Sequence, residues 1–200
     1  MRRDLATIVR NAFANGVIEP FRIVKIERMD GVTHLNTEML PSDLTAYEWL
    51  PIYQKSVPTD KKDAYLYLGA CGIVSVAAAI VLKHQVMRVQ MPEHDVVIKK
   101  DDDSKIERIY HTHHLVMTSI DGRTGNRLVL DLTGSQFGWP DDILNRWVTI
   151  DQFTAATGVT IDLIEMDPMK YLQGVEDDEQ RKRTQKMIGT LKNALQVMEA

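Results

Sequence analysis

The feature of the sequence that most limits the fold is an apolar run over residues 73–82, which only Ser75 interrupts. Three consecutive alanines and the length of the segment favour a helix, predicted over residues 71–84. The run is about half as long as the roughly 20 residues that cross a bilayer. Because this helix is apolar on nearly every side, other elements must cover it all round. The sequence therefore predicts a buried helix in a globular core and no membrane span.

Composition and charge narrow the class of protein. The chain has 200 residues, of which 44% are hydrophobic and 26% charged, as in an ordinary globular domain. Its net charge of −4 argues against a dedicated nucleic-acid binder, which needs clustered positive charge. The single cysteine, Cys71, allows no intramolecular disulfide, and no secretory signal is visible, so a cytoplasmic location is expected. We expect a single domain over residues 1–200.

Hydrophobic periodicity and turn residues predict the order of the elements. Helices are predicted over residues 2–14, from Thr45 onward, and over 71–84, 140–147, 150–157 and 177–200; strands over 21–26, 85–91, 96–100, 114–120, 127–132 and 159–166; loops over 32–44, 56–63 and 99–103. Helices followed by a run of strands form an α+β pattern. We expect the buried helix to pack on an antiparallel sheet, with the core at about residues 45–166 and an appended C-terminal helix.

Three residues are placed to support nucleophilic chemistry. Cys71 begins the buried helix, whose N-terminal N–H groups favour a thiolate and can bind an oxyanion. His114 begins a predicted strand, and Asp131 lies 17 residues later, at the end of the next one. An antiparallel pairing of two such strands brings a base and an orienting carboxylate side by side. Asp131 could instead stabilise the following turn.

The order of these residues resembles that of papain-like and transglutaminase-like cysteine enzymes, and arylamine N-acetyltransferases share it. Asp131-Leu132-Thr133 is similar to the Asp-x-Thr of transglutaminase-like domains, and residues 134–138 resemble the Gly-aromatic-Gly region of the acetyltransferases. The resemblance covers roughly residues 65–140. It implies a Cys71–His114–Asp131 triad that acts on an amide, ester or thioester of a small molecule, peptide or protein, without metal or organic cofactor. Hydrolase, deamidase and transferase activities all remain open.

The sequence departs from these families in three places around the cysteine. Tyr65 stands where papain-like proteases carry a glutamine, and Gly72 replaces an aromatic residue that often follows the nucleophile. The Arg-Gly-Gly of the acetyltransferases is reduced to Gly69, so the sequence indicates neither papain-type proteolysis nor use of acetyl-CoA. A hydroxyl of Tyr65 or Tyr67 could replace the missing oxyanion donor.

Further residues near Asp131 have two readings. Gln136, Phe137 and Trp139 either line a substrate cleft or serve only in packing.

The choice of histidine depends on the direction of side chains along one strand. Alternation puts His111 and His113 on one face and His114 on the other. We favour His114, because an apolar run follows the catalytic histidine in papain-like enzymes, and keep His113 as the second candidate. His111 and His113 with a carboxylate would also suit a metal ion, so a small metal-dependent enzyme is an alternative.

Two questions remain open at the level of sequence. A non-catalytic binding module on the same fold is a further alternative to the enzyme. The C-terminal helix over residues 177–200 has an apolar stripe that suits either docking on the domain or formation of a homodimer. No nucleic-acid or membrane partner is expected.

Overall fold

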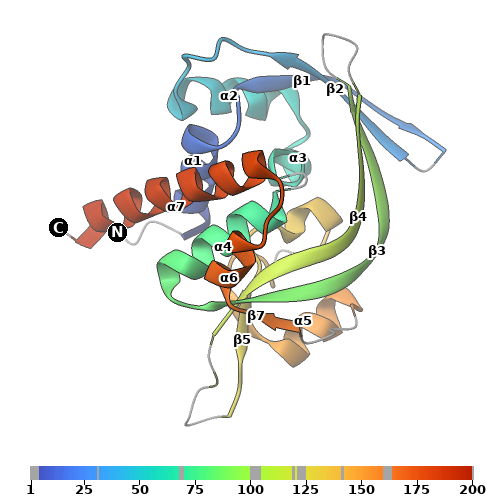
Figure 1. Ribbon diagram of the computed structural model, residues 1–200. Coiled ribbons are helices and arrows are strands. Elements are labelled where there is room, and N and C mark those ends of the chain that lie inside the picture. Colours follow the sequence, from blue (N-terminus) through green and yellow to red (C-terminus); the bar gives the residue numbers. More distant parts are fainter. Residues whose placement is uncertain are drawn as a thin grey trace.

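A computed structural model of the chain describes residues 5–30, 32–67, 70–99, 105–118, 120, 125–140, 142–159 and 164–199 (Figure 1). The fold is α+β. Its helices are α1 (Leu5–Gly16), α2 (Ala46–Ser56), α3 (Lys62–Leu66), α4 (Cys71–Leu82), α5 (Ile150–Thr157), α6 (Pro168–Gln173) and α7 (Asp178–Glu199), with 3₁₀ turns η1 (Thr59–Lys61) and η2 (Gly134–Phe137). Its strands are β1 (Phe21–Met29), β2 (Val32–Met39), β3 (Gln85–Lys99), β4 (Lys105–Met117), β5 (Leu128–Leu130), β6 (Trp147–Thr149) and β7 (Ile164–Met166).

The strands form one sheet in which β3 and β4 are the long central arms. The strand order is β1-β2-β3-β4-β5-β6, and β7 also pairs with β3. Along one edge of β3, its first residues pair with β7 and its last residues pair with β2. The β2–β3 pairing is parallel and the other pairings are antiparallel, so the sheet is not wholly antiparallel as predicted.

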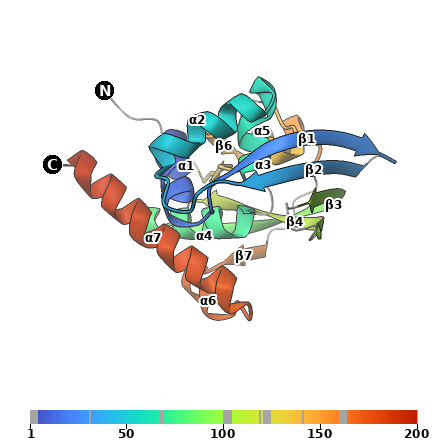
Figure 2. The same ribbon diagram turned by 90° about the horizontal axis from the view of Figure 1, so that it is seen from above.

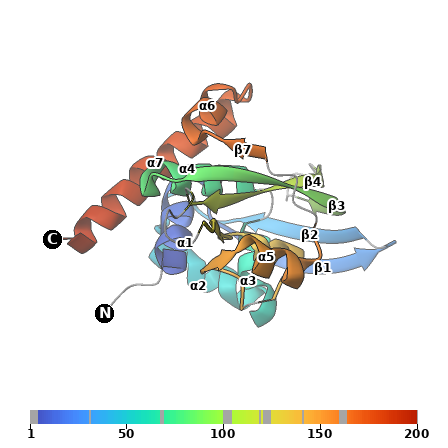
Figure 3. The same cartoon turned by 90° about the horizontal axis from the view of Figure 1, so that it is seen from below.

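Successive side chains of the central strands β3 and β4 belong to two separate hydrophobic clusters. Val86 and Val116 belong to the cluster that contains α4, whereas Met87 and Leu115 belong to a cluster around Phe153 of α5. Figure 3 shows α6 and α7 on one side of the β3–β4 pair and α5 on the other. Neighbouring residues of β4 therefore face different surroundings, which decides the roles of its histidines.

Helix α4 is enclosed on every side, as its sequence predicts. It contacts β3, β4, α1, α6 and α7, and each residue from Cys71 to Ala79 is buried. The helix ends where Lys83 adopts a left-handed conformation at φ 58° and donates its N–H to the Ile80 carbonyl. Within the part of the chain that the structure describes, no helix is both long and apolar enough to cross a membrane.

Among the N-terminal elements, α1 packs against α7, and α2 covers the core on the side away from α6 (Figure 2). Helix α2 starts at a cap in which the Glu48 carboxylate accepts hydrogen bonds from the N–H and the hydroxyl of Thr45, at 2.8 and 2.7 Å. Trp49 and Tyr53 of this helix are buried, and both rings pack on Phe21 of β1. The larger core cluster thus draws on residues before position 45 and on α7, beyond the predicted span of 45–166.

Several predicted elements are confirmed. The helices expected over 71–84, 150–157 and 177–200 correspond to α4, α5 and α7, and those expected over 2–14 and after Thr45 correspond to α1 and α2. The strands expected over 127–132 and 159–166 are present in shorter form as β5 and β7. Most of the charged loop at 99–103 and part of the turn before β5 lie outside the described residues.

Other predicted elements are wrong, and tertiary pairing explains each case. The loop predicted at 32–44 contains β2, which pairs with β1 and β3 although much of its sequence is polar. The strands predicted at 85–91 and 96–100 are one strand, β3, with a shift of register between Gln90 and His94. Strand β4 begins at Lys105, well before the predicted start at 114, because it pairs with β3 along its length. The loop predicted at 56–63 contains η1 and the start of α3.

The helix predicted at 140–147 is also absent among its described residues. Asn145 has a left-handed φ of 59° and donates its N–H to the Asp131 carbonyl at 2.8 Å, while Leu144 forms a bridge with Asp131. This tertiary pairing outweighs the favourable position of Pro140 for a first helical turn.

The enclosure of α4 predicts how much α7 contributes to stability. Leu191 of α7 is 1% exposed in the main core, so Leu191→Ala should lower the free energy of unfolding by about 2–5 kcal/mol. Lys192→Ala, on the exposed side of the same helix, is the control and should change it by less than about 0.5 kcal/mol. Urea unfolding of both variants measures the difference. Equal effects would show that α7 is not part of the folded core.

Candidate active site

Cys71 is the first residue of α4, where the backbone N–H groups have no partner within the helix itself. The first hydrogen bond of the helix runs from Val74 N–H to the Ala70 carbonyl at 2.9 Å, so the N–H groups of residues 71–73 precede the helical pattern. The positive end of the helix dipole favours negative charge at this position. Cys71 is 7% exposed, so water screens this effect little.

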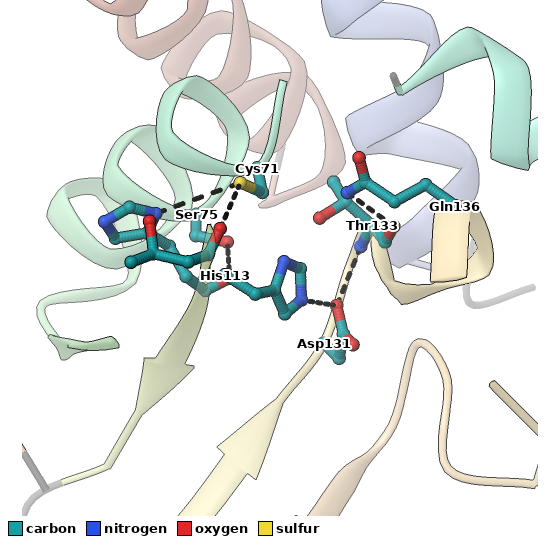
Figure 4. A network of polar contacts seen from close by, with 8 residues as sticks. Cys71, Ser75, His113, Asp131, Thr133 and Gln136 are labelled. Carbon is teal, nitrogen blue, oxygen red and sulfur yellow. Dashed lines mark hydrogen bonds and ion pairs between the residues drawn. The ribbon is translucent and has the colours of Figure 1, made fainter. Parts of the chain in front are cut away.

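The thiol of Cys71 lies against β4 at the level of residues 112–114. Its Sγ atom is 4.0 Å from the Thr112 carbonyl oxygen and 3.8 Å from His114 Nδ1 (Figure 4). The Ser75 hydroxyl, one turn further along α4, donates to the His114 carbonyl at 2.6 Å. This buried hydrogen bond holds the helix start and the strand together, so the sulfur and the histidines keep their relative positions.

The structure joins Asp131 to His113. Nε2 of His113 lies 3.0 Å from Oδ1 of Asp131, and both side chains are fully buried. The predicted pairing of Asp131 with His114 is therefore corrected, because alternation along β4 turns His114 to the α4 side and His113 to the β5 side. In Figure 4 the remaining ring nitrogen of His113, Nδ1, is on the side of the ring that faces Cys71. This arrangement places one imidazole between the thiol and the carboxylate.

Aromatic rings enclose His113. The ring of Phe137 lies 4.8 Å and that of Trp139 5.1 Å from the His113 ring, both edge to face. Trp139 packs in turn on Phe153 of α5 at 5.1 Å. Of the two sequence readings for Phe137 and Trp139, packing around the imidazole is observed directly. The rings exclude water from the His113–Asp131 pair and so strengthen its electrostatic interaction.

The Asp131 carboxylate is oriented by the chain that follows it. Its Oδ1 atom accepts the N–H of Thr133 at 3.0 Å in addition to the His113 contact. A Cβ atom at Gly134 would overlap Oδ2 of Asp131 and lie 2.7 Å from Cε3 of Trp139. Only glycine allows the backbone to pass this close to the carboxylate.

Burial and charge shift the pKa values of the two central groups in complementary directions. Burial raises the pKa of the Cys71 thiol, but the nearby polar and positively charged imidazoles of His113 and His114 lower it to about 6 from its ordinary 9. Burial lowers the pKa of His113, whereas the charge and hydrogen bond of Asp131 and the proximity of Cys71 raise it to about 10. At neutral pH this arrangement favours a thiolate beside an imidazolium.

Two residues of the C-terminal segment, Tyr171 and Gln180, also reach this site, and sequence reasoning missed them. The Tyr171 ring lies 5.3 Å from that of His114, and burial and the charge of Cys71 raise the pKa of its hydroxyl. A Cβ at Gly72 would lie 3.6 Å from the Tyr171 hydroxyl and 3.4 Å from Nε2 of Gln180. Gly72, which departs from the family pattern, thus leaves room for two polar groups. No local motif marks them, because α6 and α7 meet α4 only through tertiary packing.

The other predicted site residues pack in the core or stabilise a turn. Tyr67 is buried in the core with its ring 5.4 Å from that of Phe13, and Tyr65 packs on the same core. Gln136 is buried and donates its side-chain N–H to the Thr133 carbonyl at 3.0 Å, which stabilises the η2 turn. The predicted oxyanion role of Tyr65 and Tyr67 and the substrate role of Gln136 stay predictions.

The metal-site alternative finds no additional support. The side chain of His111 lies outside the described residues, and His113 already uses Nε2 for Asp131. Among the side chains that are described, no three potential ligands gather as a metal site would require.

Comparisons with known proteins add no identification. No protein-family model, curated protein or solved structure matches the chain.

The lowered pKa of Cys71 predicts an unusual pH profile of alkylation. The iodoacetamide rate should rise with pH to a plateau with a midpoint near 6, because only the thiolate reacts. In His113→Gln the midpoint should move toward the ordinary value of 9, because the imidazolium that lowers the pKa is gone. Since Cys71 is the only cysteine, total labelling reports it alone.

His84→Gln removes a histidine that packs on Trp147 and serves as the control, whose midpoint should stay near 6. A wild-type midpoint near 9 would contradict the pairing of a Cys71 thiolate with the His113 imidazolium.

The close approach at Gly134 predicts a large effect of one methyl group. Gly134→Ala should cost about 1–3 kcal/mol of stability, because Asp131 and Trp139 must move. Gly189→Ala is the matched control, since no atom of the described residues outside the adjacent helix backbone lies within 4 Å of the added Cβ, and alanine favours a helix by up to about 1 kcal/mol. Thermal unfolding compares the two, and a neutral Gly134→Ala would contradict the geometry.

Proposed function

We propose that the protein is a cysteine-dependent acyl-transfer enzyme in which Cys71 is the nucleophile, His113 the acid–base group and Asp131 the residue that orients His113. The observation that carries this proposal is the contact of His113 Nε2 with Asp131 Oδ1 at 3.0 Å, with the opposite ring nitrogen on the side of Cys71 (Figure 4). The proposal keeps the Cys-His-Asp order of the papain-like and transglutaminase-like resemblance but assigns the base to His113.

In the first half-reaction the Cys71 thiolate attacks the carbonyl carbon of an amide, ester or thioester. A sulfur–carbon bond forms while the carbonyl π electrons move onto oxygen. When the tetrahedral intermediate collapses, the bond to the leaving group breaks, and the leaving group takes a proton from the His113 imidazolium. The Nδ1 atom of His113 makes no hydrogen bond of standard geometry in the free protein, as is common for catalytic contacts before substrate binds.

The oxyanion would lie at the N-terminus of α4. The backbone N–H of Cys71 is one donor, and the helix dipole favours the developing charge. The Tyr171 hydroxyl and the Gln180 amide lie next to Gly72 and can supply further donors. Both groups lie beside the start of α4. This position supports them as oxyanion donors in place of the glutamine that papain-like proteases carry before the cysteine.

In the second half-reaction, neutral His113 takes a proton from water or from an amine, which attacks the acyl-enzyme and releases the Cys71 thiolate. Water gives a hydrolase or deamidase, and an amine gives a transferase. The donor is a small molecule, a peptide or a protein, and no metal or organic cofactor is required. A reducing location such as the cytoplasm would keep the lone cysteine in its reactive thiol form.

The acylation step itself tests the proposal. Intact mass should show one acyl group on the wild type after incubation with activated esters and thioesters, and none on Cys71→Ala. His113→Gln should slow acylation by about 10²–10⁴-fold, because general acid–base catalysis is lost. Asp131→Asn should slow it as well, because Asp131 no longer stabilises the imidazolium.

His114→Gln is the matched control, since His114 lies 3.8 Å from the sulfur but is not the residue bonded to Asp131. We expect it to slow acylation less than tenfold. Equal rates for the wild type and His113→Gln would reject the catalytic role, and an unreactive Cys71 would favour a non-catalytic binding module.

A further inference from the structure

We propose that Thr133 positions the water molecule that releases the acyl group from Cys71, so that the protein is a hydrolase. This inference rests on the proposed function and goes beyond it, because that function leaves water and amines equally open as acceptors. It is carried by buried polar atoms around Cys71 and His113.

The side-chain hydroxyl of Thr133 is buried together with an imidazole nitrogen that is also unpaired. Thr133 and His113 are each 0% exposed. Among the described residues, neither Oγ1 of Thr133 nor Nδ1 of His113 has a hydrogen-bond partner. Buried polar atoms in folded proteins are almost always hydrogen-bonded, and each exception calls for an explanation. Two such exceptions within one site point to a polar molecule that both atoms bind during the reaction.

Asp131 holds Thr133 close to His113. Its Oδ1 atom lies 3.0 Å from Nε2 of His113 and also accepts the N–H of Thr133 at 3.0 Å. In Figure 4 the hydroxyl of Thr133 points toward the region between Cys71 and His113, on the side of the ring that carries Nδ1. The sulfur, Nδ1 and the hydroxyl therefore border the same region of the site.

The backbone of Thr133 is fixed at both ends of the residue. Its N–H donates to Asp131, and its carbonyl accepts the side-chain N–H of Gln136 at 3.0 Å. Thr133 also follows β5, whereas the proposed oxyanion donors next to Gly72 come from α6 and α7. The hydroxyl is therefore held in a defined place and is distinct from the groups assigned to the oxyanion.

In the second half-reaction this arrangement offers a water molecule two acceptors. Water donates one hydrogen to Nδ1 of neutral His113 and the other to Oγ1 of Thr133, which turns an oxygen lone pair toward the acyl carbon on Cys71. The oxygen–carbon bond forms while the first hydrogen passes to Nδ1 as a proton. When the intermediate collapses, the carbon–sulfur bond breaks, its electron pair returns to sulfur, and a carboxylic acid leaves.

Burial of the site favours water over a larger acceptor. Cys71 is 7% exposed, and Thr133 and His113 are fully buried. The organic substituent of an amine would place carbon among these polar atoms and leave hydrogen bonds unmade, which is costly in a buried site. Water has only the two hydrogens that the two acceptors bind, so hydrolysis is the outcome that the arrangement supports.

The lifetime of the acyl-enzyme tests the role of Thr133. With 4-nitrophenyl acetate, the initial burst of nitrophenolate measures acylation of Cys71, and intact mass measures loss of the acetyl group. Thr133→Val keeps the shape of the side chain without its hydroxyl. We expect it to release the acetyl group about 10–10²-fold more slowly, because water is no longer oriented, while its burst rate stays within about threefold of wild type.

Three controls separate this role from a structural one. Thr133→Ser keeps the hydroxyl and should release the acetyl group within about threefold of wild type. Thr37→Val makes the same exchange at a buried threonine of β2, opposite Ile23 of β1, and should match the wild type. The iodoacetamide midpoint of Thr133→Val should stay near 6, because His113 and Asp131 are unchanged. Thr133→Ala, which also lacks the hydroxyl, replaces Thr133→Val if that variant fails to fold.

The possible failures differ from one another. If the acetyl-enzyme of Thr133→Val decays as fast as that of the wild type, the role of Thr133 is overturned. A slower burst with unchanged release would assign the hydroxyl to the oxyanion, and a midpoint that moves toward 9 would assign it to support of the triad; both results overturn the inference. If the wild type forms no acetyl-enzyme, the proposed function fails and the inference fails with it.

Discussion

Complete coverage of helix α4 is the constraint on which the rest of the structure depends. A helix without a polar side is stable in water only if neighbours enclose it, and here β3, β4, α1, α6 and α7 do so. The enclosure carries the first residue, Cys71, into the interior beside β4. There the imidazoles of His113 and His114 act on the sulfur with little screening, so its pKa falls despite burial.

The second constraint is the buried pair of His113 and Asp131. Two polar groups taken out of water are costly unless they are paired, and a further hydrogen bond to either of them reduces the cost. Asp131 therefore also accepts the Thr133 N–H, and Gly134 lets the chain pass close to the carboxylate. The same segment then carries Trp139 onto the His113 ring. One continuous piece of chain, from Asp131 to Trp139, thus holds the His113 ring in place.

Elements with a strong local signal were predictable, and elements that depend on distant partners were not. Helix α4 follows from its apolar content. Helix α5 follows from Thr149, which caps its start, and from Gly158, which ends it. Strand β2 was missed because its many polar residues are stabilised by pairing with β1 and β3. The helix expected at 140–147 fails because the backbone of Asn145 bonds to Asp131 instead.

For the candidate site, the sequence alone determined the residue types: a cysteine at the start of a buried helix, a group of histidines, and an aspartate ahead of a glycine turn. These follow from local spacing. The tertiary structure decided which histidine meets Asp131, because a shift of one residue along a strand reverses the face of a side chain. It also decided that Tyr171 and Gln180 reach Gly72. Residues so far apart in sequence meet only through packing, which no local pattern encodes.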